Sequence, residues 1–217
     1  MVLIVPIMEN ENQSESSIVY ILTNEAMPGY IKIGWTTNLE KRVSDLSNVS
    51  VPLPFEVFFA KRVSNGRGIE NKMHAAFAKD RINSGAGREF FSLSPEQAAA
   101  ALSIAEGEEV TPQDDPALTA QEKQEIADIK KIRPRFKFSF VDIKPGDILK
   151  FFMDDSITCV VADDREVIFR GEKVSLGHAS ELVLKEKEYN WKAVSGPNTW
   201  IYEGETLYER RLRMENE

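Results

Sequence analysis

Apolar and polar residues alternate in two short runs near the start of the chain, and this period of two is typical of β-strands. The runs, with a turn-forming segment between them, are Val19-Tyr20-Ile21-Leu22, Met27-Pro28-Gly29 and Tyr30-Ile31-Lys32-Ile33-Gly34. We therefore predict an antiparallel hairpin. Side chains two residues apart share one face of a strand, so we expect Tyr30, Lys32 and Gly34 on the same face. A glycine there lets a phosphate backbone or a helix approach closely.

The apolar period changes to three or four residues after the hairpin, which indicates a helix. Thr37 or Asn38 can cap it, and its apolar stripe is made by Leu39, Val43 and Leu46. Arg42 falls roughly 60° from Leu39, at the edge of that stripe. Two interpretations stay open for Arg42. Either it is aimed along the sheet toward Tyr20, or it covers apolar surface with its stem.

A second helical segment spans residues 66–77 and carries Glu70 and His74, four residues apart and therefore one above the other. A carboxylate near the start of a helix is stabilised by the helix dipole alone. The functional alternative is that Glu70 binds a hard divalent cation through oxygen. A single helical histidine such as His74 is more often a surface or packing residue than a ligand.

In this order the residues resemble the GIY-YIG endonuclease superfamily, in the branch whose second motif reads Lys-Ile-Gly. Val19-Tyr20 corresponds to the first signature and Lys32-Ile33-Gly34 to the second, with Arg42 at the family spacing. Glu70 matches the metal-binding glutamate. Arg88-Glu89-Phe90-Phe91 is similar to the Glu-aromatic-Phe close of this branch. The resemblance covers about residues 17 to 104.

The resemblance implies a metal-dependent DNA endonuclease that hydrolyses phosphodiester bonds with Mg²⁺ or Mn²⁺ and leaves a 5′-phosphate and a 3′-hydroxyl. Tyr20 would act on the attacking water as general base or by orienting it. Arg42 would stabilise charge on the phosphate, and Glu70 would hold the metal. Substrate contacts are expected from Tyr30, Gly34 and His74.

Lys32 departs from the family, because the better-studied members have a second tyrosine there. Tyr30 would substitute from about 7 Å along the same face, or Lys32 would contact the phosphate itself. A lysine can also lower the pKa of a nearby tyrosine such as Tyr20. Lys32 favours the alternative function, a non-cleaving DNA- or protein-binding module on a nuclease scaffold. Asn83 is the candidate for the family's late asparagine.

Composition and charge restrict this interpretation. The chain of 217 residues is long enough for two small domains, and its single cysteine, Cys159, excludes a disulfide framework. The net charge of −8 is uneven: residues 17–93 carry +3 and residues 94–128 carry −8. A mildly basic first domain is compatible with DNA as the partner. The apolar start, residues 1–8, is too short for a signal peptide, and no run spans a membrane, so we expect a cytoplasmic protein.

Capping signals locate the domain boundaries. Ser94-Pro95-Glu96-Gln97 opens a helix to about Ile104, and Thr119-Ala120-Gln121-Glu122 opens another to about Lys131. Between them residues 105–117 are acidic and aperiodic, as in a linker or surface loop. We predict a disordered segment at 1–16, a nuclease-like domain at 17–104, a connector at 105–132 and a second domain at 133–217. At this boundary a basic run either contacts nucleic acid or leads into an edge strand: Lys130, Lys131, Arg133, Arg135 and Lys137.

The second domain is predicted to be β-rich, with strands at 147–153, 157–162 and 166–169 and turns at Asp154-Asp155 and Asp163-Asp164. A helix from Ser175 to about Lys185 follows, then Trp191, Trp200 and Gly204-Glu205-Thr206-Leu207. This pattern weakly resembles the RAMA-type module (restriction enzyme and adenine methylase associated). The resemblance implies target recognition on DNA, as in restriction or phage defence. The predicted fold class is α+β: a small antiparallel sheet flanked by helices, then a second small β-rich α+β domain.

Overall fold

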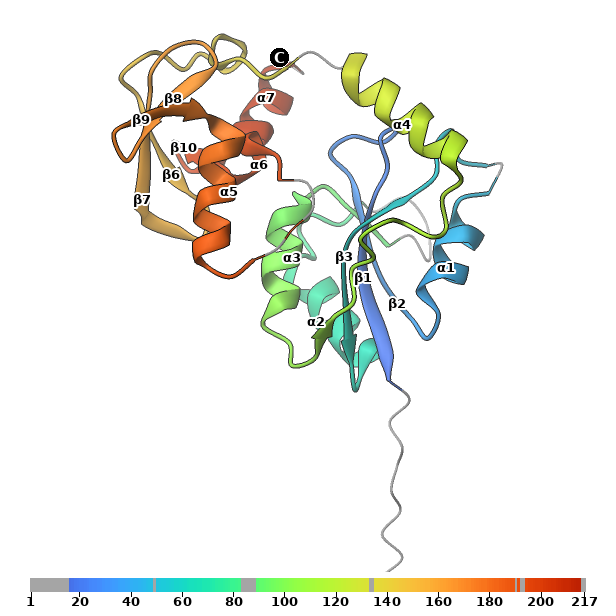
Figure 1. Cartoon of the computed structure of the whole chain (residues 1–217). Helices are drawn as coiled ribbons and strands as arrows, with labels where there is room; N and C mark the ends of the chain where they lie inside the picture. The colour runs from blue at the N-terminus through green and yellow to red at the C-terminus, as the bar shows by residue number, and fades with distance from the viewer. Residues whose placement is uncertain are drawn as a thin grey trace, which may run out of the picture.

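The computed structural model describes residues 16–48, 50–82, 89–132, 135–189, 191 and 194–215. Within these ranges the chain is α+β, with two antiparallel sheets and helices against them, as predicted (Figure 1). Residues 1–15 of the predicted disordered segment, Asn83, Arg88 and Arg133 lie outside the described residues. No helix in the described part of the chain has the length and apolarity that crossing a membrane requires.

The first sheet has the strand order β4-β2-β1-β3-β5. Its centre is the predicted hairpin, in which Tyr20 pairs with Gly34 and Ile21 with Ile33. The strands are β1 (Ser17–Thr23), β2 (Ile31–Thr36), β3 (Glu56–Val63), β4 (Phe90–Phe91) and β5 (Glu108–Glu109). β4 pairs with only the first two residues of β2, so the rest of β2 forms an edge of the sheet.

Helices cover both faces of this sheet. One face packs Ile18, Tyr20 and Leu22 against Val43 of α1 (Leu39–Leu46). The other face packs Val19, Ile21, Ile31 and Ile33 against α2 (Gly66–Ala76) and α3 (Pro95–Ser103). The alternation of strand side chains therefore divides the core into two layers, with the arginine-bearing and glutamate-bearing helices on opposite sides (Figure 1).

The acidic segment after α3 differs from the expected linker or surface loop, because it adds a strand to the sheet. In β5, Glu108 and Glu109 pair with Arg62 and Lys61 of β3. The Val110 N–H donates to the Ala60 carbonyl at 2.8 Å. The positive charges of Lys61 and Arg62 on β3 offset the negative charge of β5. The β-propensity of glutamate alone does not favour a strand here. The capping box at Thr119 and Glu122 then opens α4 (Ala120–Ile132) as predicted.

The second sheet has the order β11-β10-β6-β7-β8-β9. Its strands are β6 (Ile148–Phe151), β7 (Asp154–Val161), β8 (Glu166–Phe169), β9 (Glu172–Ser175), β10 (Trp200–Tyr202) and β11 (Glu205–Thr206). Asp154 and Asp155, predicted as a turn, instead begin β7, and β9 was not predicted. The β8–β9 hairpin turns at Arg170 and Gly171, both with positive φ, and this two-residue turn extends the sheet by one strand.

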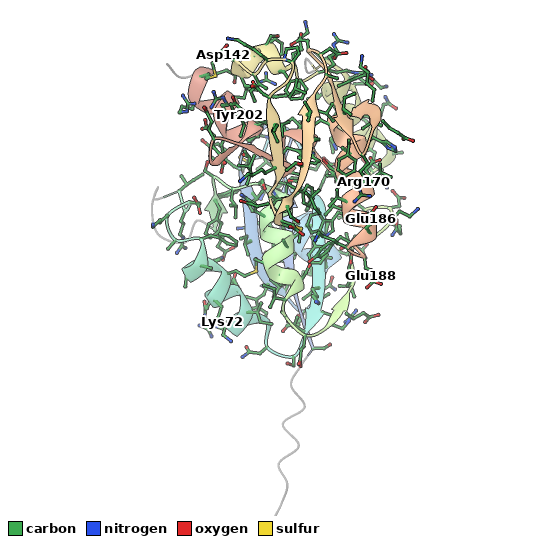
Figure 2. All side chains as sticks on the ribbon, turned by 90° about the vertical axis from the view of Figure 1, so that its left-hand side faces the viewer. Lys72, Asp142, Arg170, Glu186, Glu188 and Tyr202 are labelled. Carbon is green, nitrogen blue, oxygen red and sulfur yellow. The ribbon has the colours of Figure 1, made fainter. Side chains whose placement is uncertain are left out.

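Helix α5 (Leu176–Glu186) begins at the predicted cap, where the Ser175 hydroxyl accepts from the His178 N–H. In Figure 2 the Arg170 turn lies beside the end of α5, where Arg170 pairs with Glu186. The basic run does not lead into an edge strand, because a 3₁₀ helix, η1 (Phe138–Val141), follows it. Helix α6 (Gly196–Thr199) then precedes β10.

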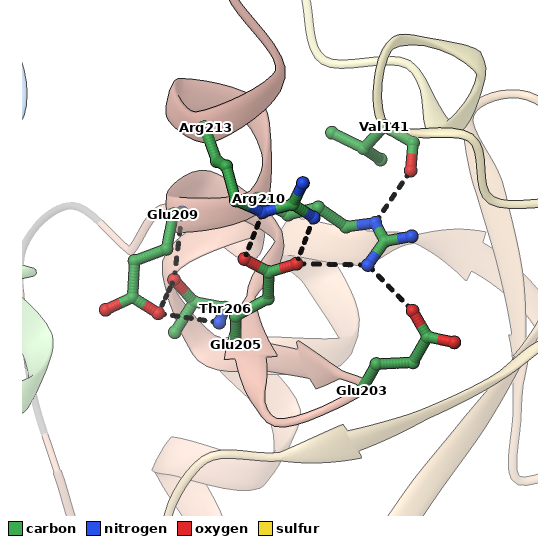
Figure 3. Close-up of polar contacts among 7 residues, drawn as sticks. All are labelled: Val141, Glu203, Glu205, Thr206, Glu209, Arg210 and Arg213. Atoms are coloured by element: carbon green, nitrogen blue, oxygen red, sulfur yellow. Dashed lines mark hydrogen bonds and ion pairs between the residues drawn. The ribbon is translucent and has the colours of Figure 1, made fainter. Parts of the chain in front are cut away.

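The last helix, α7 (Leu207–Glu215), is fixed by charged groups (Figure 3). Arg210 donates to Glu203, Glu205 and the Val141 carbonyl, and its side chain is 12% exposed. Arg213 adds a second guanidinium to Glu205 at 2.7 Å. This network attaches α7 to both β11 and η1.

The two sheets share one continuous apolar core. Phe58 of β3 packs against Trp191, with ring centroids 6.3 Å apart. Beside this contact Glu96, in the first turn of α3, is fully buried. Its carboxylate accepts from the Ser195 N–H at 2.8 Å and from Asn198 Nδ2 at 2.9 Å. Two buried hydrogen bonds thus join the first sheet's helix to α6.

Candidate functional site

Helix α1 presents Arg42 to Tyr20. The Asn38 side chain caps the helix by accepting from the Lys41 N–H, as predicted, and Val43 is the helix residue buried in the core. This orientation leaves Arg42 at the edge of the apolar stripe. Arg42 Nε donates to the Tyr20 hydroxyl at 3.1 Å. Of the two interpretations of Arg42, the structure therefore has the one in which its head is aimed at Tyr20.

Gly34 makes room for the Tyr20 ring. The two residues are cross-strand partners, and a Cβ on Gly34 would lie 2.4 Å from the Tyr20 hydroxyl oxygen. The close approach at this glycine is therefore made by the protein's own phenol. Tyr20 is fully buried, and this burial raises its pKa, although the Arg42 hydrogen bond and charge act in the opposite direction. The phenol is neutral at neutral pH, which suits a hydrogen-bonding role better than general-base work.

Helix α2 contacts both central strands of the first sheet, β1 and β2. Its first residue, Gly66, donates its N–H to the Ser17 hydroxyl at 2.7 Å, and His74 Nε2 lies 3.1 Å from the Ile33 carbonyl. Glu70 lies one turn before His74 on the same side of the helix. It therefore lies beside the part of β2 that β4 does not cover, although α2 packs on the face opposite to α1. Lys72, two residues further, points to solvent from α2 (Figure 2).

Glu70 is a buried carboxylate that lacks a hydrogen-bond or ion-pair partner among the described residues, and it is 8% exposed. Burial raises its pKa, and the charge of Glu89 adds to this effect, while Lys32, Arg42 and Arg67 lower it. A carboxylate in this position is stabilised by a cation. Mg²⁺ commonly uses one or two carboxylates together with substrate phosphates. No cluster of three or more His, Cys, Asp or Glu side chains that could hold a metal ion lies among the described residues.

Lys32 forms an ion pair that the sequence analysis missed. Its Nζ lies 2.7 Å from Glu89 Oε2 and 5.2 Å from the centroid of the Phe90 ring. The cation beside the Tyr20 hydroxyl is Arg42, whereas Lys32 is held by Glu89. In the sequence Glu89 stands out only as part of the Arg88-Glu89-Phe90-Phe91 motif. Its separation of 57 residues from Lys32 gave no local signal, but the strand-forming Phe90-Phe91 after it could have placed it at the edge of β2.

Two other residues predicted to contact substrate are Tyr30 and His74. Tyr30 is separated from the group of Arg42, Tyr20 and Glu70, and His74 is held by contacts within the protein. Tyr30 lies just before β2 and is 44% exposed, whereas Lys32 is buried. Tyr30 lines a cavity of about 370 Å³ between the two sheets, together with Glu25, Lys130 and Tyr208. His74 is held by the Ile33 carbonyl and packs at a tilted angle against Phe91, with ring centroids 5.0 Å apart. Burial lowers its pKa.

Most of the described basic run has acidic partners. Lys130 pairs with Glu56 at 2.9 Å, and Lys131 pairs with Asp128 at 3.2 Å. Lys137 lies 4.0 Å from Asp164. These pairs reduce the positive charge that this run would offer to phosphates, so nothing in the geometry favours it over the Arg42 region for DNA contact.

The fold and this group of residues define a small α+β module with an arginine, a buried tyrosine and a buried carboxylate around one strand edge. Residues 17–106 match the family model of the T5orf172 domain, a phage-type, nuclease-like or DNA-binding module. The match covers the first sheet up to the segment before β5. Comparisons with curated proteins and with solved structures gave no match.

Proposed function

We propose that the chain is a divalent-metal-dependent DNA endonuclease of the GIY-YIG type, whose site is built from Arg42, Tyr20 and Glu70. The observation that carries this proposal is the pairing of an oriented guanidinium with an unpartnered buried carboxylate at one edge of β2. The T5orf172 match over the same residues supports it. DNA is the proposed substrate and Mg²⁺ or Mn²⁺ the proposed cofactor.

Each side chain has a role that follows from its contacts. Arg42 uses Nε on Tyr20, so its terminal nitrogens, which have no hydrogen-bond partner in the described part of the chain, are left to donate to phosphate oxygens. Tyr20 fixes the guanidinium plane. Glu70 would hold the divalent ion, which when bound neutralises charge on the leaving oxygen. Because the Tyr20 hydroxyl is buried and its pKa raised, positioning is its better-supported role.

The test is cleavage of plasmid and single-stranded DNA with Mg²⁺ or Mn²⁺. Glu70→Gln should abolish cleavage, because the amide keeps the shape but loses the charge. Arg42→Lys should lower the rate by about 10²-fold or more, the scale seen when one transition-state donor is lost. Matched controls are Glu108→Gln and Arg62→Lys, an exposed pair on the same sheet. Equal rates for Arg42→Lys and Arg62→Lys would assign Arg42 to packing.

A specific observation favours the second candidate, a non-cleaving DNA- or protein-binding module. Tyr20 is fully buried, and Lys32, which replaces the family's second tyrosine, is occupied by Glu89. Under this alternative the wild type cuts neither DNA form with either metal, yet binds DNA in a salt-dependent way. Retained binding in Glu70→Gln, without cleavage by the wild type, would establish it.

We propose that the second sheet selects the target, in line with the RAMA resemblance and with a role in restriction or phage defence. Three apolar side chains form a row across the outward face of β6, β7 and β8. Ile148 pairs with Val160 and Val160 with Ile168, and they are 59%, 38% and 38% exposed. An exposed apolar row of this kind marks an interaction surface.

The experiment that tests this role of the second sheet uses the full chain. Deleting one sheet would disrupt the apolar core that the two sheets share. Replacing Ile148, Val160 and Ile168 together by threonine retains β-propensity and removes apolar surface. We expect altered target choice or affinity with an unchanged rate at saturation. Unchanged DNA affinity at several salt concentrations would point to a protein partner or a structural role for this sheet.

A further inference from the structure

The buried ammonium of Lys32 is the least expected feature of the site. Lys32 is 6% exposed, and a lysine in such a place requires a counter-ion. Glu89 supplies it at 2.7 Å, and the Glu89 side chain is 28% exposed. The pair therefore lies at the boundary between the sheet and solvent, with the ammonium on the inner side.

Ile33 of β2 has main-chain contacts with the segment that carries Glu89 and with the helix that carries Glu70. The Ile33 N–H donates to the Glu89 carbonyl at 3.2 Å. The Ile33 carbonyl is contacted by His74, one helical turn from Glu70. Backbone and helix contacts on one residue thus bring Glu70 and Glu89 to the same stretch of strand edge. Glu70, Glu89 and Lys32 are therefore close enough for their charges to interact.

We propose that Glu70 and Glu89 form a two-carboxylate cation site in which the Lys32 ammonium is a built-in counter-ion. The Lys32 ammonium supplies the positive charge that a second metal ion would otherwise provide. The site therefore binds a single divalent ion, on the side of Glu70. Glu89 strengthens the negative field there, and Lys32 weakens it. This inference rests on the proposed function for its metal, but it concerns binding and not cleavage.

The two partners of the ion pair should therefore shift metal affinity in opposite directions. Lys32→Met removes the positive charge with little change in stem length and should tighten Mn²⁺ binding. Glu89→Gln removes the negative charge and should weaken it. Each change should be about tenfold or more, since a unit charge a few ångströms away in a partly buried site carries several RT. A purely structural pair would give two losses in the same direction.

The experiment is calorimetric titration of the full-length protein with Mn²⁺ in the absence of DNA. Lys61→Met is the matched control, because Lys61 lies in the same sheet but donates to the Ser103 carbonyl and not to a carboxylate. It should leave the affinity unchanged. Lys32→Arg keeps the charge and should bind Mn²⁺ within about threefold of the wild type, smaller than the tenfold effect of charge removal. Thermal melts of each variant confirm folding.

Opposed shifts in Mn²⁺ affinity for Lys32→Met and Glu89→Gln would establish the counter-ion role. They would do so even if no variant cleaves DNA, a result that would overturn only the nuclease proposal. Shifts in the same direction, no shift in either variant, or no Mn²⁺ binding by any variant would overturn the counter-ion role. If cleavage depends on Glu70 but Mn²⁺ affinity changes with neither Lys32→Met nor Glu89→Gln, the proposed function stands and this inference fails.

Discussion

The buried Glu96 carboxylate between the two sheets should make the stability of the protein depend on pH. Its side chain is fully buried, and burial raises its pKa from 4.5 to about 7, although the hydrogen bonds from Ser195 and Asn198 act in the opposite direction. The other charged groups that line the neighbouring cavity are Glu25, Glu56 and Lys130. Lys130 pairs with Glu56, and Glu96 forms no ion pair with the residues that the structure describes.

The sign and size of the effect follow from linkage. A carboxyl with a folded pKa above its unfolded value contributes stability that is complete below about pH 4.5 and is lost as the pH rises through about 7. A difference of about 2.5 pKa units, at 1.36 kcal/mol for each, corresponds to about 3 kcal/mol across this window. The free energy of unfolding should fall by about that amount through the ionisation of Glu96 alone.

Glu96→Gln isolates this contribution. The glutamine carbonyl can accept from the Ser195 N–H, and its amide needs an acceptor from Asn198. Asn198 Oδ1 is buried without a hydrogen-bond partner among the described residues, so a flip of the Asn198 amide supplies that acceptor. We expect the variant to fold. Glu96→Ala instead leaves two donors unpaired and should cost about 2–5 kcal/mol.

The assay is urea unfolding at pH 5, 6, 7 and 8, followed by tryptophan fluorescence, with wild type and Glu96→Gln side by side. The difference in unfolding free energy between them should change by about 2–3 kcal/mol from pH 5 to pH 8, with the variant gaining on the wild type as the pH rises. Parallel curves for the two proteins would refute the argument, because they would mean that Glu96 titrates alike in the folded and unfolded chains.

Three further predictions follow from packing and burial. Gly34→Ala places a Cβ against the Tyr20 ring and should lower stability by about 1–3 kcal/mol, the usual cost of overpacking, seen as a lower urea midpoint; an unchanged midpoint would mean that the ring has other space. Arg210→Met removes the guanidinium that Glu205 and Glu203 share and should cost about 1–3 kcal/mol in the same assay, against a near-neutral Arg211→Met on the same helix. Burial raises the pKa of Cys159 to about 12, so a disulfide reagent should modify it only as fast as the protein unfolds, and rapid reaction in native buffer would contradict its placement.

Local signals predicted the local parts of the fold. The alternation around Pro28 and Gly29 gave the hairpin, and Asn38, Ser94, Thr119 and Ser175 each cap the helix predicted for them. Turns and helix caps depend on residues three or four positions apart, so they can be predicted directly from the sequence. For Arg42 the sequence predicted only a place at the edge of the apolar stripe and left two directions open, and the contact with Tyr20 decides between them.

Long-range contacts account for what the sequence did not predict. β5 consists of two glutamates, and only the neighbouring Lys61 and Arg62 of β3 make it a strand. The role of Glu89 depends on a lysine far away in the chain. The space at Gly34 is filled by a ring from the adjacent strand, which periodicity along one strand cannot show.

The core shared by the two sheets also restricts how this chain can have been assembled and how it can be rebuilt. A recombination event that exchanged the second sheet for another sequence would remove the side chains that Phe58 and Glu96 contact. Homologous exchange would therefore succeed only when α3 and the start of β3 are exchanged together with the second sheet. For the engineer, the practical unit of grafting is the whole chain from β1 to α7, and substitutions on the outward face of the second sheet disturb the shared core less than replacement of that sheet.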